Sequence, residues 1–597
     1  MFSLLLASLA SLSSLAGAQH LFDRNLAYSS PFANSPYLSH NTHALHARHV
    51  AFAKRQIDGP TPPQLGDTQS SEGFVDEHYP TFYGGDFSAS PSIYNGGINF
   101  THSVASGDPF DDSVLLWTRA VPIGSQLPDQ SIPICASFKI FDNADLSGRP
   151  VDSGDAFTSY DVDWTLKVEA NNLRPDSHYW FQFSDCTNSS TVSPVGTTRT
   201  ISSPNRWFNA YGVAAHNTSA DLFLHLGDYI YESLGNGAKI GRQTLGRELA
   251  TIADYRLRLN QYRTDDDHEV ADQAWKAGTA DSNDTALGCS FSPSGACFTD
   301  RKLAAVRAYH EWMPIRQVDP DDKLRIWRNF QIGKLLDLTM LDTRQYDRDI
   351  TDYLTECLAV INSIADVTNR SLMGTEQESW FYETLSESKA RGATWRVVGQ
   401  QIVFTMLNES GSLDVDAWDG YRSNRNRVLD HLYTNNIGNT IILSGDSHAN
   451  WVSDLALLLD PNQTVTYNPL TGEGAIGVEF AGTAVSSTSS FGAGISPANA
   501  DKISTVLVGA NTDLQWSEGS YRGFFTLTLD PHQANATYWA MRNVSASAQL
   551  RHVHEGNANL GAFPSATFNV KAGANKLSRP VAGGSVMAGV LKVQGQD

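Results

Sequence analysis

The chain has 597 residues, of which 41% are hydrophobic and 18% are charged, a balance that predicts a globular protein with roughly two to four domains. Its formal net charge of −21 argues against a nucleic acid or an anionic membrane as partner, because like charges repel. A small phosphorylated ligand is not excluded, since a local cationic site can override the field of the whole protein.

The N-terminal segment, residues 1–18, has a short apolar core and ends in Ala16-Gly17-Ala18. This pattern predicts a signal peptide cleaved before Gln19, and hence a protein secreted to the extracellular space or the cell wall. We expect no transmembrane segment, because no later run reaches the roughly 18 apolar residues that a spanning helix needs. Residues 19–95 are rich in Ser, Pro, Gly, Asn and His and are interpreted as a poorly ordered leader. Within it, Lys54-Arg55 is either a processing site or a solvated basic pair.

Residues 96–200 are predicted to form a β-sandwich domain of the immunoglobulin or fibronectin type. Residues 113–118 and 136–141 have the composition and alternation of strands. Residues 173–183 form a turn that leads into a further strand, and Tyr179 occupies the position of the corner tyrosine of such sandwiches. About 100 residues of short strands fit one domain of this kind.

Residues 205–545 alternate between strand and helix patterns, which predicts an α/β domain. Apolar strands are expected at 222–226, 338–341, 396–398 and 440–443, and helices at 301–312, 376–388 and 424–433. Residues 546–597 are rich in Gly, Ala and Ser and are expected to form a loose C-terminal tail. The predicted fold class is therefore α/β, with the β-sandwich domain first in the chain.

Secretion would permit both glycosylation and disulfide formation. Asn-x-Ser/Thr sequons provide candidate glycosylation sites at Asn99, Asn188, Asn217, Asn283, Asn369, Asn408, Asn462, Asn535 and Asn543. Cys289 and Cys297 bracket a turn-rich loop that a disulfide could close, and Cys135 and Cys186 could pair within the sandwich domain. Cys357 is then unpaired, unless the pairing differs. None of the cysteines has the Cys-x-x-Cys spacing typical of a metal site.

Two apolar runs end abruptly in Gly-Asp, one at Asp228 with Tyr231 close behind it, the other at Asp446 with His448 two residues on. Each pair alone could be a turn that caps a buried strand. Functional groups of α/β sheets lie just beyond the carboxyl ends of strands, so the two pairs together with the acidic cluster at 265–269 favour a metal centre. Carboxylates suit hard cations such as Ca²⁺, imidazole suits transition metals, and a Tyr phenolate suits Fe³⁺.

Eight motifs occur in order over residues 98–530, and together they resemble those of the PhoD-like alkaline phosphatase and phospholipase D family of metallophosphoesterases. They lie at residues 103–109, 114–119, 224–232, 266–270, 341–346, 418–421, 445–448 and 522–524. The chain is similar to a fungal-type secreted member of the family with internal deletions. The resemblance implies an N-terminal β-sandwich followed by a metallophosphoesterase α/β sandwich, the same division that the strand and helix patterns indicate.

The resemblance implies an alkaline phosphatase, a hydrolase of phosphoric esters that uses Fe³⁺ and Ca²⁺ and a metal-activated hydroxide. Its substrate would be a small phosphate ester or phosphodiester. The metal ligands that the resemblance implies are Asp228, Tyr231, Asp267, Asp446 and His448. Among them Asp228 would bridge the metals, and Tyr231 would bind iron. The alternative for Tyr231 is an aromatic side chain at the edge of the core.

Two further side chains are expected to act in catalysis. His268 lies at the edge of the implied site, as a ligand or a proton donor. Arg344 is expected to hold the substrate phosphate by a forked hydrogen bond. For Arg344 the alternative is a structural salt bridge with Asp342 or Asp347.

The chain departs from the family pattern in two places. The family has a Ser-Cys pair shortly before the first Gly-Asp motif, and that Cys binds iron, but residues 200–209 contain no Cys. The family also has an apolar strand ahead of Asp-Asp-His-Glu, where residues 261–265 are polar. These departures leave two alternatives to a phosphatase: a shortened, catalytically impaired secreted glycoprotein (a natural variant or a faulty gene model), or a phospholipase D-type phosphodiesterase.

Overall fold

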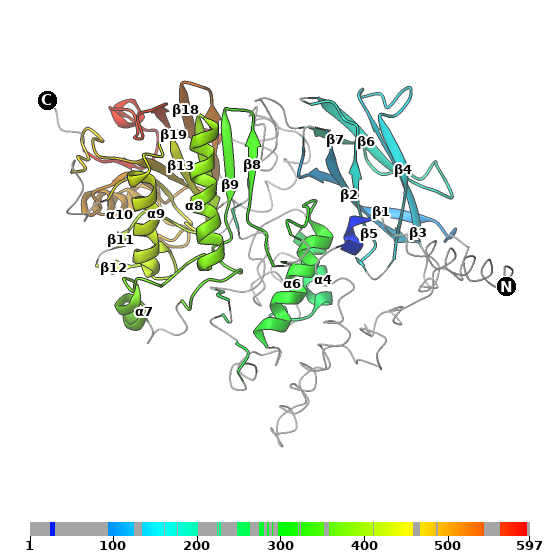
Figure 1. Ribbon diagram of the computed structural model, residues 1–597, viewed down its shortest axis with the longest axis horizontal. Coiled ribbons are helices and arrows are strands. Elements are labelled where there is room, and N and C mark those ends of the chain that lie inside the picture. The colour runs from blue at the N-terminus through cyan, green and yellow to red at the C-terminus, as the bar shows by residue number, and fades with distance from the viewer. Residues whose placement is uncertain are drawn as a thin grey trace, which may run out of the picture. The chain divides into compact units, whose positions relative to one another are not determined.

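The structure is a computed structural model, and it describes residues 24–29, 94–110, 112–123, 134–159, 162–175, 177–200, 224, 226–227, 248–262, 274–276, 278–279, 283–285, 289, 297–319, 322, 324–351, 358–409, 411–457, 466–484, 488–541 and 562–593. The chain divides into two compact units, shown in Figure 1. The first comprises residues 1–202, 232–264 and 282–325, and the second comprises residues 203–231, 265–281 and 326–597.

The first unit contains two antiparallel sheets that share one core. One sheet has the order β1 (Ile98–Gly107), β2 (Val114–Pro122) and β5 (Thr165–Ala170). The other has the order β4 (Asp152–Thr158), β3 (Ile134–Phe141), β6 (His178–Asp185) and β7 (Gly196–Arg199). Side chains that alternate along the strands, such as Leu116, Phe138 and Phe181, form the core between the sheets. The predicted β-rich domain is therefore present.

Two helices, α4 (Ile252–Tyr262) and α6 (Phe298–Trp312), complete the first unit. Glu311 of α6 is fully buried and accepts hydrogen bonds from Arg256 at 2.7 Å and from Arg307 at 2.8 Å. The backbone carbonyl of Glu311 also accepts a hydrogen bond from the indole of Trp117, at 2.9 Å. Because buried charges are stable only when they are paired, this cluster fixes α6 against α4 and the sandwich.

Both disulfides expected from the sequence are present in the first unit. Cys135 and Cys186 join β3 to the end of β6 with an S–S distance of 1.95 Å. Cys289 and Cys297 close the predicted turn-rich loop with an S–S distance of 2.00 Å. The fifth cysteine, Cys357, lies outside the described residues.

A short piece of the predicted leader is part of the sandwich, so the expectation of a poorly ordered leader is wrong for residues 24–29. The 3-10 helix η1 (Leu26–Ser29) follows Asn25, whose side chain is fully buried. Its amide nitrogen donates to the carbonyls of Phe157 and Thr165 at 2.9 Å, and its oxygen accepts from the N–H of Lys167 at 3.0 Å. Asn25 thus pairs backbone groups of β4 and β5, which composition alone does not reveal.

The second unit is built on a mixed sheet of eight strands. Its order is β20 (Val590–Leu591), β16 (Leu514–Glu518), β14 (Asn450–Leu455), β15 (Gly477–Ala481), β13 (Thr440–Ser444), β10 (Trp395–Gln400), β9 (Leu336–Met340) and β8 (Arg328–Ile332). The central strands β15, β13, β10 and β9 lie side by side, and all four run parallel to one another. Three of them match the predicted strands at 338–341, 396–398 and 440–443. Of the predicted strand at 222–226, only Leu224 and Leu226 are described, and neither lies in a strand.

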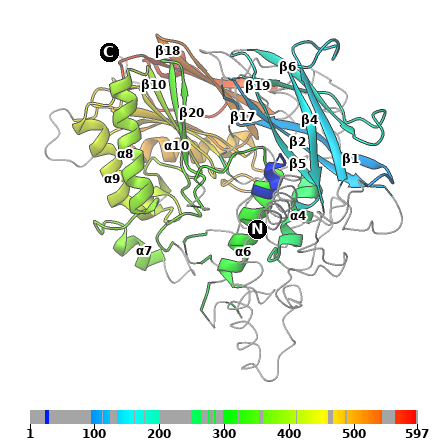
Figure 2. The same ribbon diagram turned by 45° about the vertical axis from the view of Figure 1, so that its right-hand side comes forward.

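Helices cover one face of this sheet. These are α8 (Gly374–Arg391), α9 (Arg422–Thr434) and α10 (Pro497–Ala510), with α7 (Leu358–Ile364), the 3-10 helix η6 (Trp418–Tyr421) and a small hairpin of β11 (Asn408–Glu409) and β12 (Ser412–Leu413). Val398 and Ile442 pack against α8 and α9, which run side by side in both views (Figures 1 and 2). The predicted helices at 301–312, 376–388 and 424–433 correspond to α6, α8 and α9.

An antiparallel sheet covers the opposite face. It has the order β17 (Gly523–Leu529), β18 (Gln533–Met541) and β19 (Ala562–Lys571). Successive residues of the central strands point to opposite faces, so Val397 and Ile441 pack against Tyr538 and Phe568 of this sheet. The second unit is therefore an α/β sandwich in layers, as the predicted fold class requires.

The expectation of a loose C-terminal tail is wrong for residues 562–593. β19 pairs with β18 along its length, β20 extends the eight-stranded sheet beside β16, and the 3-10 helix η7 (Val581–Gly584) lies between them in sequence. Arg579 donates to the fully buried carboxylate of Asp454 at 2.6 Å and anchors the segment to β14. The alternation of Ala566, Phe568 and Val570 with Thr567 and Asn569 signals a strand, a signal that the high content of small residues obscured.

Candidate functional site

Three loops meet where the parallel strands β9, β10 and β13 end. Because the carboxyl ends of parallel strands lie at one edge of a sheet, the residues after Met340, Gln400 and Ser444 are brought together. The amide of Gln401 links two of these loops: its oxygen accepts from the N–H and the hydroxyl of Thr343 at 2.8 and 2.6 Å, and its nitrogen donates to the carbonyl of Leu341 at 2.8 Å.

The loop after β13 holds Asp446 and His448 in a rare backbone conformation. Their φ angles are +52° and +48°, in the left-handed region that costs a non-glycine residue about 1–3 kcal/mol. The surroundings maintain this conformation: the hydroxyl of Ser447 donates to the carbonyl of Ala449, and Arg522 donates to the carbonyl of His448 at 2.7 Å. These contacts hold the turn in a conformation that its own residues do not favour.

The imidazole of His448 is oriented by a backbone carbonyl. Its Nδ1 lies 2.9 Å from the carbonyl oxygen of Thr488. A neutral ring that donates from Nδ1 carries its lone pair on Nε2, the arrangement that metal-binding histidines in proteins adopt. The side chain is half-buried, as is suitable for a ligand at the edge of a site.

Leu226 and Gly227, which precede Asp228 in the chain, lie beside the turn that carries Asp446. A Cβ atom added to Gly445 would be 2.6 Å from the carbonyl oxygen of Leu226, so these backbones are in close contact and only glycine fits. A Cβ atom added to Gly227 would be 3.3 Å from Cγ of Gln401. The structure thus places Leu226 and Gly227 at the strand-end edge that carries Gln401 and Gly445.

Several predicted site residues cannot be compared with this geometry. Asp228, Tyr231, Asp267 and His268 lie outside the described residues. The same holds for residues 201–209, the part of the chain that corresponds to the Cys-bearing segment of the family. The described part of the site therefore consists of the loops that carry Arg344, Gln401 and Asp446, with Gly227 at its border.

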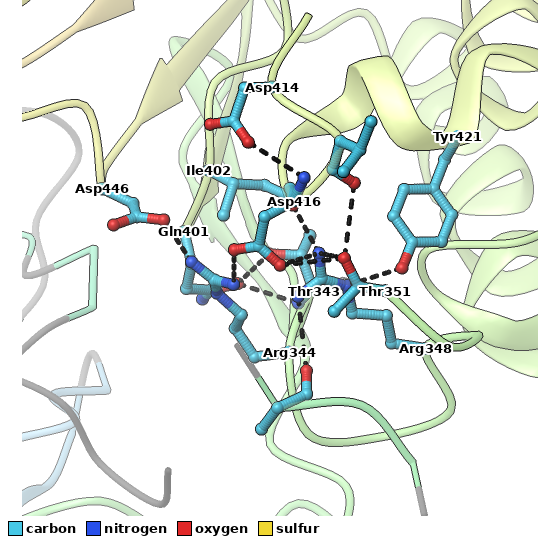
Figure 3. A network of polar contacts seen from close by, with 12 residues as sticks. Thr343, Arg344, Arg348, Thr351, Gln401, Ile402, Asp414, Asp416, Tyr421 and Asp446 are labelled. Carbon is cyan, nitrogen blue, oxygen red and sulfur yellow. Dashed lines mark hydrogen bonds and ion pairs between the residues drawn. The ribbon is translucent and has the colours of Figure 1, made fainter. Parts of the chain in front are cut away.

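Arg344 connects two of the strand-end loops to each other (Figure 3). One terminal nitrogen of its guanidinium group donates to Asp416, and the other donates to Asp446. Its own backbone N–H donates to the carboxylate of Asp342 at 3.0 Å. Arg344 therefore forms salt bridges, as the alternative expected, but the carboxylates found here, Asp416 and Asp446, are distant in sequence.

Asp416 is shared by two arginines. Its second carboxylate oxygen accepts from Arg348 at 2.7 Å and from the hydroxyl of Thr351 at 3.1 Å. Burial would raise the pKa of Asp416, but the guanidinium groups of Arg344 and Arg348 outweigh this effect and hold its pKa well below the usual range. Asp416 is therefore ionised at neutral and alkaline pH.

A buried carboxylate, Glu479, supports the same edge from β15. It accepts from the N–H groups of Phe404 and Thr405, both at 2.8 Å, and from the hydroxyl of Ser444 at 2.5 Å. Its hydrogen bonds thereby join the loop after β10 to the last residue of β13, directly before Gly445 and Asp446. Neither Glu479 nor Asp416 was singled out from the sequence, although an acid within the apolar strand β15 is a usable signal.

One cluster resembles a metal site but cannot act as one. Ligand atoms of Cys135, Cys186 and Asp155 lie within 4.8 Å of one another in the first unit. Because the two sulfur atoms form a disulfide, they cannot bind a metal as thiolates. Asp446 and His448 offer a better-suited donor set, an oxygen and a nitrogen on one turn.

Comparisons with known proteins agree with this architecture. A family model described as PhoD-like phosphatase matches residues 197–538, and one described as the PhoD-like phosphatase N-terminal domain matches residues 88–202. Alkaline phosphatase D of Bacillus subtilis (strain 168) is 31% identical over 479 residues, which cover 74% of this chain and 77% of that protein. A solved structure of PhoD has a TM-score of 0.62 and 28% identity, and the match covers 82% of this chain and 93% of that one.

The family match and the similarity to alkaline phosphatase D and PhoD identify the chain as a hydrolase of phosphoric esters. The chain belongs to the PhoD-like phosphatase family.

Proposed function

We propose that the chain is a metal-dependent phosphoric ester hydrolase whose centre lies at Asp446 and His448. The observation that carries the proposal is the contact of Leu226, two residues before Asp228, with Gly445 in the Asp446 turn. Gly445 can pack against Leu226 only because it lacks a side chain, and we infer that Asp228, which follows Gly227, reaches the same edge of the sheet. Convergence of acidic and imidazole groups from two strands is what a metal centre of this class requires.

The donor set suits the expected cations. Asp446 and His448 provide an oxygen and a nitrogen, and Asp228, Tyr231 and Asp267 are the proposed remaining ligands for Fe³⁺ and Ca²⁺. When bound, such ions supply activation of the attacking water and neutralisation of the charge on phosphorus. The strained turn supports this role, because it fixes the Asp446 and His448 side chains before any ligand arrives.

Arg344 is proposed to bind the substrate phosphate. Its guanidinium group is planar and offers several donors, a geometry that matches a phosphate. It lies against Asp446, so a phosphate held by metals at that residue would also be within its reach. His268 is the proposed proton donor to the leaving group.

The proposed substrate is a small phosphate monoester or diester outside the cell. Two disulfides support an oxidising compartment, and the described helices include none that is long and apolar enough to cross a bilayer. Among the described sequons, Asn99, Asn188, Asn369 and Asn408 are exposed and are the proposed glycan carriers, whereas Asn283 and Asn535 are half-buried.

We further propose that the sandwich of the first unit is of the fibronectin or immunoglobulin type. Sheets of three and four strands with orders β1-β2-β5 and β4-β3-β6-β7 support this assignment. The hydroxyl of Tyr179 accepts a hydrogen bond from the backbone N–H of Arg174 at 2.7 Å, as expected for a corner tyrosine.

Activity of the purified full chain on chromogenic substrates tests the function. The proposal predicts release of p-nitrophenol from p-nitrophenyl phosphate or from bis-p-nitrophenyl phosphate, and loss of that release after chelation. Choline release from phosphatidylcholine, measured in parallel, would identify phospholipase D-type cleavage. A folded, metal-loaded chain that releases none of these products would support the catalytically impaired glycoprotein instead.

A further inference from the structure

We propose that Asp416 is a positioning residue, which anchors one side of the Arg344 guanidinium group so that its other side faces the phosphate binding position beside Asp446. This inference rests on the proposed function, because it assigns the orientation of a side chain that acts on the phosphate. It concerns a carboxylate 30 residues before Asp446 that belongs to none of the expected ligands.

The carboxylate of Asp416 is fixed in several directions (Figure 3). One oxygen binds Arg344, and the other accepts from Arg348 at 2.7 Å and from Thr351 at 3.1 Å. Its backbone N–H donates to the side chain of Asp414 at 2.9 Å. The carboxylate of Asp416, which binds Arg344, therefore has little freedom to rotate.

Arg348 provides a rigid base for this arrangement. Its side chain is fully buried and donates to the hydroxyl of Tyr421 at 3.0 Å and to the carbonyl of Ala274 at 3.3 Å. Tyr421 in turn donates to the carbonyl of Asp349 at 2.7 Å. Because its partners are buried polar groups, moving Arg348 would leave several of them unpaired, and this opposes any displacement of Asp416.

The two ion pairs of Arg344 differ in their exposure to solvent. The side chain of Asp416 is 10% exposed and that of Asp446 is 32% exposed. Ion pairs are strongest where water is excluded, so the pair with Asp416 is the permanent one, and the contact on the Asp446 side can be exchanged. Asp416 thus determines which edge of the guanidinium group remains for a phosphate.

Fixing Arg344 in advance lowers the entropy cost of binding a phosphate. A free arginine side chain loses rotational freedom when it binds, whereas one already held by Asp416 has lost much of that freedom during folding. Replacing the carboxylate by an amide removes the charge and one acceptor, so the guanidinium groups of Arg344 and Arg348 lose the buried counter-ion that they share. We expect the guanidinium group of Arg344 to turn away from its position in Asp416→Asn.

The test measures the inhibition constant of inorganic phosphate against hydrolysis of p-nitrophenyl phosphate by the full chain. Asp416→Asn is expected to raise both this constant and KM about tenfold. In the Arg344→Gln background the same substitution is expected to change the constant less than twofold, because Asp416 acts through Arg344. An unchanged constant in Asp416→Asn, or equal effects in both backgrounds, overturns the proposal.

Two further variants separate positioning from general stability. Asp366→Asn breaks the exposed ion pair with Arg422 in the same unit, and it should leave the phosphate inhibition constant unchanged. Asp416→Glu keeps the charge and displaces it by one methylene, so it should fold even where Asp416→Asn does not, with the constant raised about threefold. An unchanged constant in Asp416→Glu overturns the proposal.

Measurement of the wild-type chain comes first and distinguishes the two levels of inference. A wild-type chain that folds but hydrolyses no ester contradicts the proposed function and with it the role of Asp416. An active wild-type chain whose phosphate inhibition is insensitive to Asp416→Asn overturns the positioning role alone.

Discussion

The carboxylate of Asp446 accepts a hydrogen bond from the guanidinium group of Arg344, although the two residues lie 102 positions apart in the sequence. They follow β13 and β9, strands that are separated by β10 in the sheet. The pair places a permanent positive charge next to a residue that we assign to metal binding. A phosphate bound beside Asp446 would therefore lie within reach of the guanidinium group of Arg344.

Replacing Arg344 tests the role of this charge. Arg344→Gln is expected to lower kcat/KM for p-nitrophenyl phosphate by about 100-fold, because a preorganised donor to a developing anion is typically worth a factor of 10²–10³. Steady-state kinetics measures the effect. Arg422→Gln, which removes an arginine paired with the exposed Asp366 in the same unit, is the matched control and should retain wild-type kinetics. Equal activities of the two variants would contradict the assigned role.

The imidazole of His448 should determine metal content. His448→Ala removes the proposed nitrogen ligand, and the affinity for the transition metal is expected to fall at least tenfold, while circular dichroism of the folded chain stays unchanged. Elemental analysis of protein purified in parallel with wild type measures the loss. Wild-type amounts of metal in His448→Ala would show that this side chain is not a ligand.

The buried carboxylate of Asp419 predicts a pH dependence of stability. Burial raises its pKa to about 7, against the opposing effects of Arg425 and the N–H of Leu407. An unfolded Asp has a pKa of about 3.9, so between about pH 4 and pH 7 the folded state binds more protons than the unfolded state. The free energy of unfolding therefore falls as pH rises through this window, with a slope of up to about 1.4 kcal/mol per pH unit, and levels off above pH 7.

Comparison with Asp419→Asn isolates this contribution, because the amide does not titrate. Urea unfolding of the wild type and the variant at pH 5, 6, 7 and 8 should give a stability difference that shifts in favour of the variant up to about pH 7 and then stays constant. A difference that is the same at all four pH values would show that Asp419 titrates in its ordinary range.

The N-terminal segment is expected to stabilise the first unit through Asn25. In Asn25→Ala the N–H of Lys167 and the carbonyls of Phe157 and Thr165 each lose the hydrogen bond to Asn25, and we expect a loss of about 2–3 kcal/mol. Thermal unfolding measures the change. Asn171→Ala, at an exposed position of the same unit, should change stability by no more than about 0.5 kcal/mol. Identical melting temperatures for both variants would contradict the role of Asn25.

Local patterns in the sequence predicted the layers of the second unit well. β10 and β13 are buried along their length and contain the apolar runs 397–398 and 441–443, and Asp446 and His448 follow β13 in a motif that marks a strand end. Burial on both faces forces such runs to be apolar, so the signal is strong. The two carboxylates that pair with Arg344 could not be predicted, because Asp416 and Asp446 reach it only through the tertiary fold.

Other features had weak or misleading signals. The role of Asn25 depends on backbone groups more than 130 residues away, and no local pattern encodes it. β19 lies in a segment rich in small residues, a composition typical of loose segments, so its alternating pattern is a weak signal. Glu479 is a charged residue in a buried strand, and its purpose becomes evident only when the N–H groups of Phe404 and Thr405 are seen to bind it.

Anomalous scattering from crystals of the full chain tests the central claim most directly. Data collected above and below the iron absorption edge would locate a bound transition metal without reference to activity. The account predicts an anomalous peak within coordination distance of both the carboxylate of Asp446 and Nε2 of His448. A fully occupied metal peak elsewhere, with no peak at these two residues, would contradict it.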